Sequence, residues 1–284
     1  MSEIMLGAEV AAAMKDILVQ EAGQLESRGV KPLLSIIRVG ARPDDLAYER
    51  GATKRMSGIG IECRVVEFPE DVSQADFEAG FQRENDAPAV HGILLFRPLP
   101  KGLDEEPVKA MINPIKDVDC MCAVNLAKVF SADESGHAPC TAEAVMEMLD
   151  YYKIDPEGKK VTVIGRSMVI GKPVSMLLLK RNATVTICHT RTRNMVEICK
   201  EADILVAAAG KAKMVTGELV GKGAVVLDVG INVDSDGGLC GDVAFEEVKE
   251  RAAYISPVPR GVGSVTTSVL AKHVIKAAKY LNGF

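Results

Sequence analysis

The stretch VTVIGRSMVIGKP, residues 161–173, has the residue types of a turn that binds an anion. A β-branched run leads into Gly165, and Gly171 and Pro173 follow where a helix would begin. The first turn of a helix has N–H groups without intrahelical partners, so a strand–turn–helix unit suits a phosphate. Gly171 permits close backbone approach, and Pro173 loses little at an early helical position. The spacing is not G-x-G-x-x-G, so a plain tight connection and a cofactor turn are equally open.

The strand expected next along the chain, TVTIC at residues 184–188, ends in a basic turn. An NAD site usually has an Asp or Glu about 20 residues after the glycine turn, where it binds the ribose 2′-hydroxyl. The residues found here are HTRTR, residues 189–193, and none is acidic. Arginines with hydroxyl neighbours suit a 2′-phosphate, so NADP is favoured over NAD if a dinucleotide binds. A solvated basic turn explains the same residues.

Short apolar runs alternating with helical patterns predict an α/β protein. Strands are expected at residues 32–39, 62–68, 90–96, 160–165, 184–188, 203–209 and 224–230, and helices at 44–58, 73–84, 105–112, 142–152 and about 265–281. Residues 113–141 lack clean periodicity. The runs of the second half are typical of central parallel strands. The sequence therefore predicts two α/β domains, the second with a Rossmann-like doubly wound sheet.

The composition fits a globular chain with small-molecule partners. With 34 basic and 39 acidic residues, the net charge of −5 favours neither nucleic acid nor an anionic membrane as partner. No apolar run reaches the roughly 18 residues that span a bilayer. Residues 1–16 contain acids and lack a signal peptide's basic region, so we expect an amphipathic helix and a cytoplasmic protein. The seven scattered cysteines fit reduced thiols, and Cys120 and Cys122 lack a second pair, so no metal site is expected.

Taken together, these segments resemble the methylenetetrahydrofolate dehydrogenase/cyclohydrolase family. The matching stretches are KDVD (116–119), PCT (139–141), VIGRSMVIGKPVSMLLL (163–179), ATVTICHTRT (183–192), ADILVAAAGK (202–211), VVLDVGIN (225–232), GDV (241–243) and SPVPRGVGSVT (256–266), with the helix of Tyr48. They extend over almost the whole chain, and their order is specific to the family.

The resemblance implies a folate-binding catalytic domain at residues 1–142, completed by a C-terminal helix at 265–284. A Rossmann-like NAD(P)-binding domain would occupy residues 143–264, with a cleft between the two domains. Family members oxidise 5,10-methylenetetrahydrofolate to the methenyl form, and many also hydrolyse that product to 10-formyltetrahydrofolate. The resemblance also implies a homodimer.

Family motifs place the expected site residues. The cofactor site would comprise Gly165, Arg166, Ser167, Gly171, Pro173, Thr190, Arg191 and Ile231, and the tetrahydrofolate site Tyr48, Asp119, Pro259 and Gly261. Tyr48 and Asp119 would be the catalytic residues, Tyr48 stacking on the pterin and Asp119 hydrogen-bonding to it. The alternatives are a packing role for Tyr48 and a loop cap for Asp119. Asp228 could cap a strand end or contact the cofactor, and His189 could be a satisfied strand-end histidine.

Two departures from the family pattern concern catalysis. The pattern has a catalytic lysine four residues after the tyrosine and a glutamine in Gln-Leu-Pro-Leu-Pro. This sequence reads YERGATK and LLFRPLP, which puts Ala52 at the lysine position and Phe96 at the glutamine position. At about 100° per residue, position 52 shares the face of Tyr48, whereas Lys54 lies about 240° round the helix. Arg55 returns to that face, but a guanidinium keeps its proton in proteins and cannot act as the base.

Other departures surround the folate side. Asp45 replaces a serine, and family glycines are replaced at Cys120, Ala127 and Arg260. The loop PVPRGVGS also ends in Ser264 instead of proline, and Arg97 follows Phe96. These changes could reshape the pterin or glutamate pocket.

The two family reactions make different demands. Hydride transfer mainly needs two rings held in contact, whereas hydrolysis needs a positioned group of tuned pKa. The departures therefore predict a dehydrogenase without cyclohydrolase activity. Two alternatives are open: a bifunctional enzyme with an unusual water-activating group such as Asp45, and a folate- or nucleotide-binding paralogue without catalysis.

Overall fold

The computed structural model describes residues 2–234 and 237–284, and the chain divides into two compact α/β units. The three-stranded unit comprises Ala13–Cys140 and Thr267–Phe284. The six-stranded unit comprises the residues up to Ala12 and Thr141–Thr266. The helices are α1 (Gly7–Glu26), α2 (Pro43–Ser57), α3 (Gln74–Asp86), α4 (Glu106–Met111), α5 (Ala123–Phe130), α6 (Cys140–Tyr151), α7 (Gly171–Lys180), α8 (Met195–Lys200), α9 (Phe245–Val248) and α10 (Thr266–Leu281), with short 3-10 turns at Gly217–Leu219 and Val262–Ser264.

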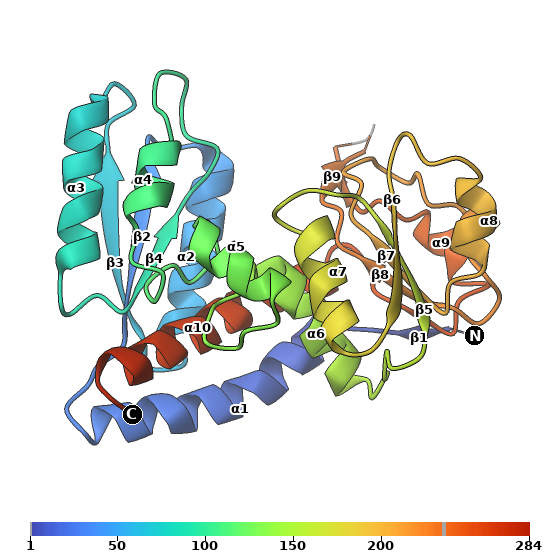
Figure 1. Ribbon diagram of the computed structural model, residues 1–284, viewed down its shortest axis with the longest axis horizontal. Helices are drawn as coiled ribbons and strands as arrows, with labels where there is room; N and C mark the ends of the chain where they lie inside the picture. Colours follow the sequence, from blue (N-terminus) through green and yellow to red (C-terminus); the bar gives the residue numbers. More distant parts are fainter. Residues whose placement is uncertain (1, 235–236) are drawn as a thin grey trace. The chain divides into compact units, whose positions relative to one another are not determined.

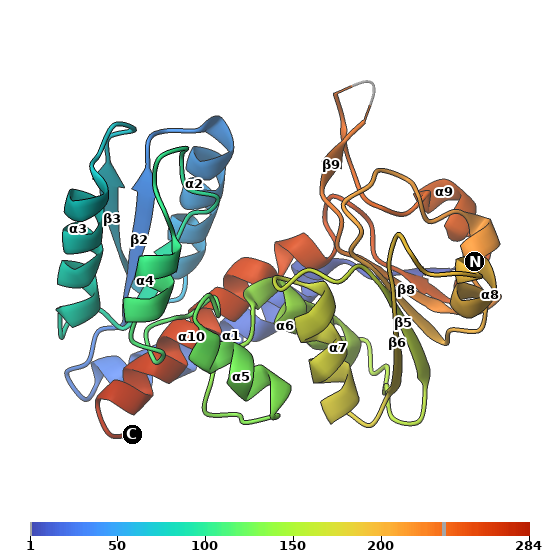
Figure 2. The same cartoon turned by 45° about the horizontal axis from the view of Figure 1, so that its top comes forward.

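The three-stranded sheet is parallel, in the order β3-β2-β4. Its strands are β2 (Leu33–Val39), β3 (Glu62–Phe68) and β4 (Gly92–Leu95). Every residue of β2 is buried, because α2 and α3 cover opposite faces of the sheet (Figures 1 and 2). The β2 strand is apolar except at Ser35 and Arg38, which fits a central parallel strand buried on both faces.

The six-stranded sheet is also parallel, in the order β1-β11-β8-β7-β5-β6. Its strands are β1 (Glu3–Ile4), β5 (Lys160–Ile164), β6 (Thr184–Cys188), β7 (Ile204–Ala207), β8 (Val225–Asp228) and β11 (Tyr254–Ile255). Helices α6 and α7 lie on one face, and α8 and α9 on the other (Figures 1 and 2). The predicted doubly wound sheet is confirmed.

The structure differs from expectation at the N-terminus. We expected a helix in the first sixteen residues, within the first domain. Instead Glu3 and Ile4 form β1, which pairs with Tyr254 and Ile255, and α1 begins only at Gly7. This pairing assigns the N-terminal residues to the six-stranded unit. A two-residue strand is too short to show a periodic pattern. Its pairing partner also lies at the other end of the sequence, so no local pattern indicates the pairing.

Three local features also differ from expectation. The β6 strand was expected to be central, but it is the last strand of its sheet, and Thr184 and Thr186 are exposed. The stretch without periodicity contains α5, whose Asn125 is buried and donates to the carbonyl oxygen of Pro114. A two-stranded antiparallel ribbon, β9 (Asn232–Val233) and β10 (Leu239–Cys240), follows β8. Among the described residues, no helix is both long enough and apolar enough to cross a membrane.

Candidate functional site

Close backbone contacts fix the glycine turn after β5. Gly165 has a φ of 131°, and a Cβ there would lie 2.1 Å from the carbonyl oxygen of Ala208. A Cβ on Gly171 would lie 2.3 Å from the carbonyl oxygen of Gly165. Ser167 closes the turn, because its Oγ accepts the N–H of Ile170 at 3.1 Å. The two glycines therefore allow the start of α7 to approach the ends of β5 and β7.

The start of α7 has the features expected of an anion-binding helix end. Pro173 is buried in its first turn, and no side chain caps the helix at Ile170. The first-turn N–H groups of such a helix favour a negatively charged group. The Arg166 side chain, in the turn just before the helix, is exposed. An anion at this end of α7 would therefore lie near a cation as well as the helix dipole.

The basic turn after β6 is tightly folded and adjoins the glycine turn. The N–H of His189 donates to Thr192 Oγ1 at 2.8 Å, and the N–H of Arg191 donates to His189 Nδ1 at 3.1 Å. His189 is therefore a satisfied strand-end histidine. Thr190 and Arg191 are exposed, and the N–H of Gly165 donates to the last residue of β6 at 2.9 Å. The glycine turn and the basic turn, each predicted to bind a phosphate group of the cofactor, thus lie side by side.

These turns meet where strand order reverses. From β5 the chain continues to β6, which lies next to β5 on one side, and then to β7, which lies next to β5 on the other side. Ligands of open α/β sheets bind outside the carboxyl ends of the strands at such a switch point. Ile231, just after β8 at the same edge, has 72% of its surface exposed. The structure thus gathers all the predicted cofactor residues at one edge of the six-stranded sheet.

Asp228, at the end of β8, has a structural role. Its carboxylate accepts the N–H groups of Gly230, Asp242 and Val243 at 2.9–3.0 Å. Burial raises the pKa of Asp228 to about 6, although these three donors oppose the rise. A Cβ on Gly241 would lie 1.9 Å from Asp228 Oδ2. Of the two roles considered for Asp228, the structure shows the capping one.

Sequence reasoning missed Asp242. This residue was noticed only as part of the GDV stretch, yet it is fully buried and accepts hydrogen bonds from two separate loops. The one signal that could have found Asp242 is its place in the family motif GDV (241–243), where no long strand ends. Its contacts could not be read from the sequence, because its partners lie 10 to 33 residues away.

In the three-stranded unit, the aromatic ring of Tyr48 meets that of Phe96. The ring centroids are 5.7 Å apart, and the planes are inclined by 78°, an edge-to-face contact. Tyr48 on α2 has 40% of its surface exposed, whereas Phe96, which follows β4, is 7% exposed. Ala52 is fully buried, and Lys54 is exposed, as helical geometry predicted. The sequence did not foresee that the residue at the glutamine position would contact the tyrosine.

Asp119 lies beside the carboxyl end of β4. Asp117 forms a parallel bridge with Ile93, so Asp119 follows level with the end of that strand. Its Oδ1 accepts the N–H of Cys140 at 3.0 Å. Burial raises the pKa of Asp119, opposed by hydrogen bonds from Cys140 and by the charge of Arg97. Asp119 is therefore held by hydrogen bonding from Cys140, and the positive charge of Arg97 favours its ionised form.

Two departures from the family glycines fall at strained backbone positions. Cys120 has a φ of 57° and Arg260 a φ of 81°, both in the left-handed region that favours glycine. The carboxylate of Asp117 holds the turn at Cys120 by accepting the N–H groups of Met121 and Cys122, both at 2.9 Å. The family glycines are thus explained by backbone conformation, and here other residues adopt it.

Pro259 and Gly261 belong to the six-stranded unit, whereas Tyr48 and Asp119 belong to the three-stranded unit. Their loop packs on the start of α1, where the N–H of Gly7 donates to the carbonyl oxygen of Arg260 at 2.9 Å. A Cβ on Gly261 would lie 2.3 Å from the carbonyl oxygen of Pro257. The predicted substrate residues therefore come from both units.

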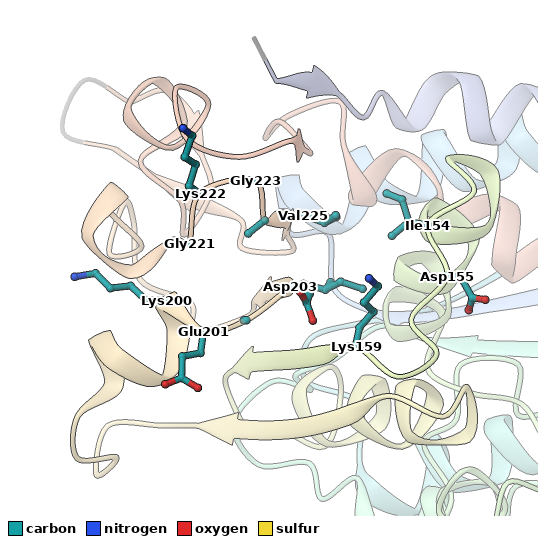
Figure 3. A pocket seen from close by; sticks show the side chains of 13 residues that line it. Ile154, Asp155, Lys159, Lys200, Glu201, Asp203, Gly221, Lys222, Gly223 and Val225 are labelled. Atoms are coloured by element: carbon teal, nitrogen blue, oxygen red, sulfur yellow. The ribbon is translucent and has the colours of Figure 1, made fainter.

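A pocket of about 300 Å³ lies at the opposite edge of the six-stranded sheet, near the amino ends of β5, β7 and β8 (Figure 3). Its charged lining residues are Asp155, Lys159, Lys200, Glu201, Asp203 and Lys222, so acids and bases balance. None of the predicted site residues lines it. Within the described part of the chain, no group of three potential metal ligands is found.

Two models of one protein family match most of the chain. Residues 5–119 match the family model described as tetrahydrofolate dehydrogenase/cyclohydrolase, catalytic domain, and residues 139–282 match the NAD(P)-binding domain of the same family. The chain belongs to the tetrahydrofolate dehydrogenase/cyclohydrolase family. The catalytic-domain match covers Tyr48, Ala52, Phe96 and Asp119, and the NAD(P)-binding match covers the glycine turn and the basic turn.

Individual relatives are similar over their whole length. The chain is 53% identical to the bifunctional protein FolD of Alkaliphilus oremlandii, with 98% of each chain covered. It is 55% identical to that of Clostridioides difficile, with 99% and 98% covered. Among solved structures, bifunctional FolD of Campylobacter jejuni has a TM-score of 0.95 at 35% identity, with 99% of each chain covered. The Trypanosoma brucei family enzyme, solved with NADP and an inhibitor, has a TM-score of 0.92 at 38% identity, with 98% of each chain covered.

Proposed function

We propose that this family member oxidises 5,10-methylenetetrahydrofolate to the 5,10-methenyl form with NADP, and that it does not hydrolyse the product. The oxidation is supported by family membership and by the cofactor residues gathered at one sheet edge. One observation carries the absence of hydrolysis. At the lysine and glutamine positions of the family pattern stand Ala52, fully buried, and Phe96, packed edge-on against Tyr48.

The residues at the carboxyl edge of the six-stranded sheet fit NADP. Gly165 and Gly171 let the backbone at the start of α7 pack closely against the ends of β5 and β7, and the first-turn N–H groups of α7 suit a pyrophosphate. At the end of β6, where an NAD site would have an acid, Thr190 and Arg191 are exposed and suit a 2′-phosphate. The trypanosomal relative is solved with NADP, which supports the same choice here.

In the proposed oxidation, this chain mainly holds and orients the folate. When bound, NADP supplies the hydride acceptor. One C–H bond of the bridging methylene breaks with its electron pair, and a folate nitrogen lone pair forms the new C=N bond, so no protein group has to carry a proton. Tyr48 is half exposed and braced by Phe96, which suits stacking on the pterin. The Asp119 carboxylate would accept hydrogen bonds from pterin N–H groups.

Hydrolysis of the methenyl product needs more from the protein. Water must attack an amidinium-type carbon and lose a proton, which calls for a positioned base or acid. Ala52 and Phe96 have no ionisable or hydrogen-bonding side-chain group. The apolar contact of Phe96 with Tyr48 also leaves no polar group at the glutamine position to orient a water.

A second candidate is a bifunctional enzyme, favoured by the bifunctional names of relatives more than 50% identical. Asp45 on α2 would then activate the water. Its Oδ2 forms an ion pair with Arg42 Nε at 2.7 Å. This contact directs the carboxylate toward Arg42, which makes Asp45 a weaker candidate than an uncommitted base.

Replacing Arg191 with alanine is expected to lower the preference for NADP. A charge-assisted hydrogen bond contributes about 1.5–3 kcal/mol, so the KM for NADP should rise about tenfold or more. The KM for NAD, which lacks the 2′-phosphate, should change little. Steady-state kinetics with both cofactors checks this. Arg181→Ala is the matched control, because Arg181 ends α7 in an ion pair with Asp150 at 2.9 Å. Equal changes for both cofactors would contradict the assignment of Arg191.

The proposed function is tested by mixing the protein with methylenetetrahydrofolate and NADP and following reduced cofactor and methenyl product together. Equal amounts of the two, with the methenyl form accumulating, are expected. Cofactor reduction with enzyme-dependent loss of the methenyl form would support the bifunctional candidate. Absence of cofactor reduction by protein that binds both ligands would refute the proposal.

A further inference from the structure

We infer that Asp242 is a positioning residue for the nicotinamide half of the cofactor site. The inference rests on the proposed dehydrogenase function and deepens it. Asp242 is fully buried, and its carboxylate accepts four hydrogen bonds, all from N–H donors. No side-chain cation is among these four donors, so the carboxylate is held by amide groups alone.

Three of the donors belong to the loop after β7. Oδ2 accepts the N–H groups of Ala209 and Gly210 at 2.6 and 2.9 Å, and Oδ1 accepts the N–H of Lys211 at 2.8 Å. The residue before this loop, Ala208, is the one whose carbonyl oxygen lies against Gly165. One carboxylate therefore fixes three consecutive amides directly beside the glycine turn.

The fourth donor belongs to the segment after β8. Asn232 Nδ2 donates to Asp242 Oδ1 at 2.9 Å. On the other side of Ile231, a Cβ on Gly230 would lie 2.4 Å from the Cγ of Asp242. Both neighbours of the exposed Ile231 are thus packed or bonded against the same carboxylate, which fixes the backbone that presents this side chain.

Sheet topology indicates which half of the cofactor these loops face. The switch point lies between β5 and β7, and a dinucleotide crosses it with one mononucleotide on each side. The basic turn that would bind the 2′-phosphate of the adenosine half follows β6, on one side. The loops that Asp242 holds follow β7 and β8, on the other side. They therefore face the nicotinamide half.

Asparagine cannot replace Asp242 in this arrangement. The four donors need two acceptor oxygens, and an asparagine would turn its own NH₂ toward N–H groups. One oxygen would lose its bonds, which leaves buried amides unsatisfied and loosens one of the two loops. The Asp242→Asn substitution therefore changes the hydrogen bonds of this side chain while its volume stays nearly constant.

The experiment compares Asp242→Asn with the wild-type protein for two ligands, NADP and its fragment 2′-phospho-ADP-ribose, which lacks nicotinamide. Binding of each is measured by calorimetry, and KM and kcat are measured with NADP and with NAD. The variant should bind NADP about tenfold more weakly, with a similar rise in KM for NAD, while fragment affinity stays at the wild-type value.

Asp203→Asn is the control, because Asp203 also accepts a backbone N–H, from Lys160 at 2.9 Å, but at the amino edge of the sheet (Figure 3). If Asp242→Asn does not fold, Asn232→Ala removes only the bond to the Ile231 segment and should show the same selective loss. Equal losses for NADP and the fragment, or no loss for either, would overturn the inference. Failure of the proposed function would be seen separately, as a lack of cofactor reduction by the wild-type protein.

Discussion

The Ala52→Lys, Phe96→Gln double variant is expected to gain methenyltetrahydrofolate hydrolysis that the wild-type protein lacks. A lysine at position 52 would share the helix face of Tyr48 and begin where the wild-type side chain is fully buried. Partial burial lowers the pKa of a lysine, which brings it toward the range useful for proton transfer. Glutamine at position 96 would replace an apolar contact with an amide that can orient water.

The expected gain is at least tenfold over the uncatalysed rate, below the roughly 10²–10⁴-fold typical of a fully positioned acid–base group. The measurement is the decay of methenyltetrahydrofolate with and without the variant. The matched control is Gly51→Lys with Phe96→Gln, because Gly51 is exposed and a Cβ there meets nothing within 4 Å. Position 51 lies about 60° from Tyr48 round the helix but is exposed, whereas position 52 is buried. If the control hydrolyses the product as fast as the test variant, the exact position of the lysine does not matter and the assignment of position 52 is wrong. No gain in either variant would mean that other departures, such as Asp45, also block hydrolysis.

The Asp119→Asn variant is expected to lose about a hundredfold in kcat/KM for methylenetetrahydrofolate, since the loss of charge-assisted hydrogen bonding to the pterin would cost about 2.7 kcal/mol in total. Asparagine retains an acceptor for the N–H of Cys140, so the fold should persist. The loss should appear mainly in kcat/KM for the folate, with the KM for NADP near the wild-type value.

Asp133→Asn is the control for this change. Asp133 lies in the same unit, is exposed, and accepts the N–H of Ser135 at 2.8 Å. The two variants should have similar thermal unfolding midpoints, and only the Asp119 variant should lose activity. Wild-type kinetics in Asp119→Asn would assign Asp119 the loop-capping role instead.

Helical and strand periodicity predicted the features that depend on local sequence. The glycine turn was located from Gly165 and Gly171, and the exposure of Lys54 followed from angular position on α2. Both depend on residues within one or two turns of each other. The same reasoning could not find β1, because Glu3 pairs with Tyr254 at the far end of the chain.

The site details that sequence reasoning missed all depend on contacts distant in sequence. The ring contact of Tyr48 with Phe96 and the four bonds to Asp242 join segments that periodicity does not relate. The positive φ angles at Cys120 and Arg260 were also hidden, because neither residue type signals a left-handed conformation. Only the resemblance pointed to these positions, as glycines in the family pattern.

The most direct test of the account is the decay of purified methenyltetrahydrofolate at increasing concentrations of the wild-type protein, with NADP reduction from methylenetetrahydrofolate measured on the same preparation. We expect rapid NADP reduction and a decay rate that does not depend on protein concentration. A decay rate that rises in proportion to the protein would show that this site hydrolyses the product without the family lysine, and would contradict the account.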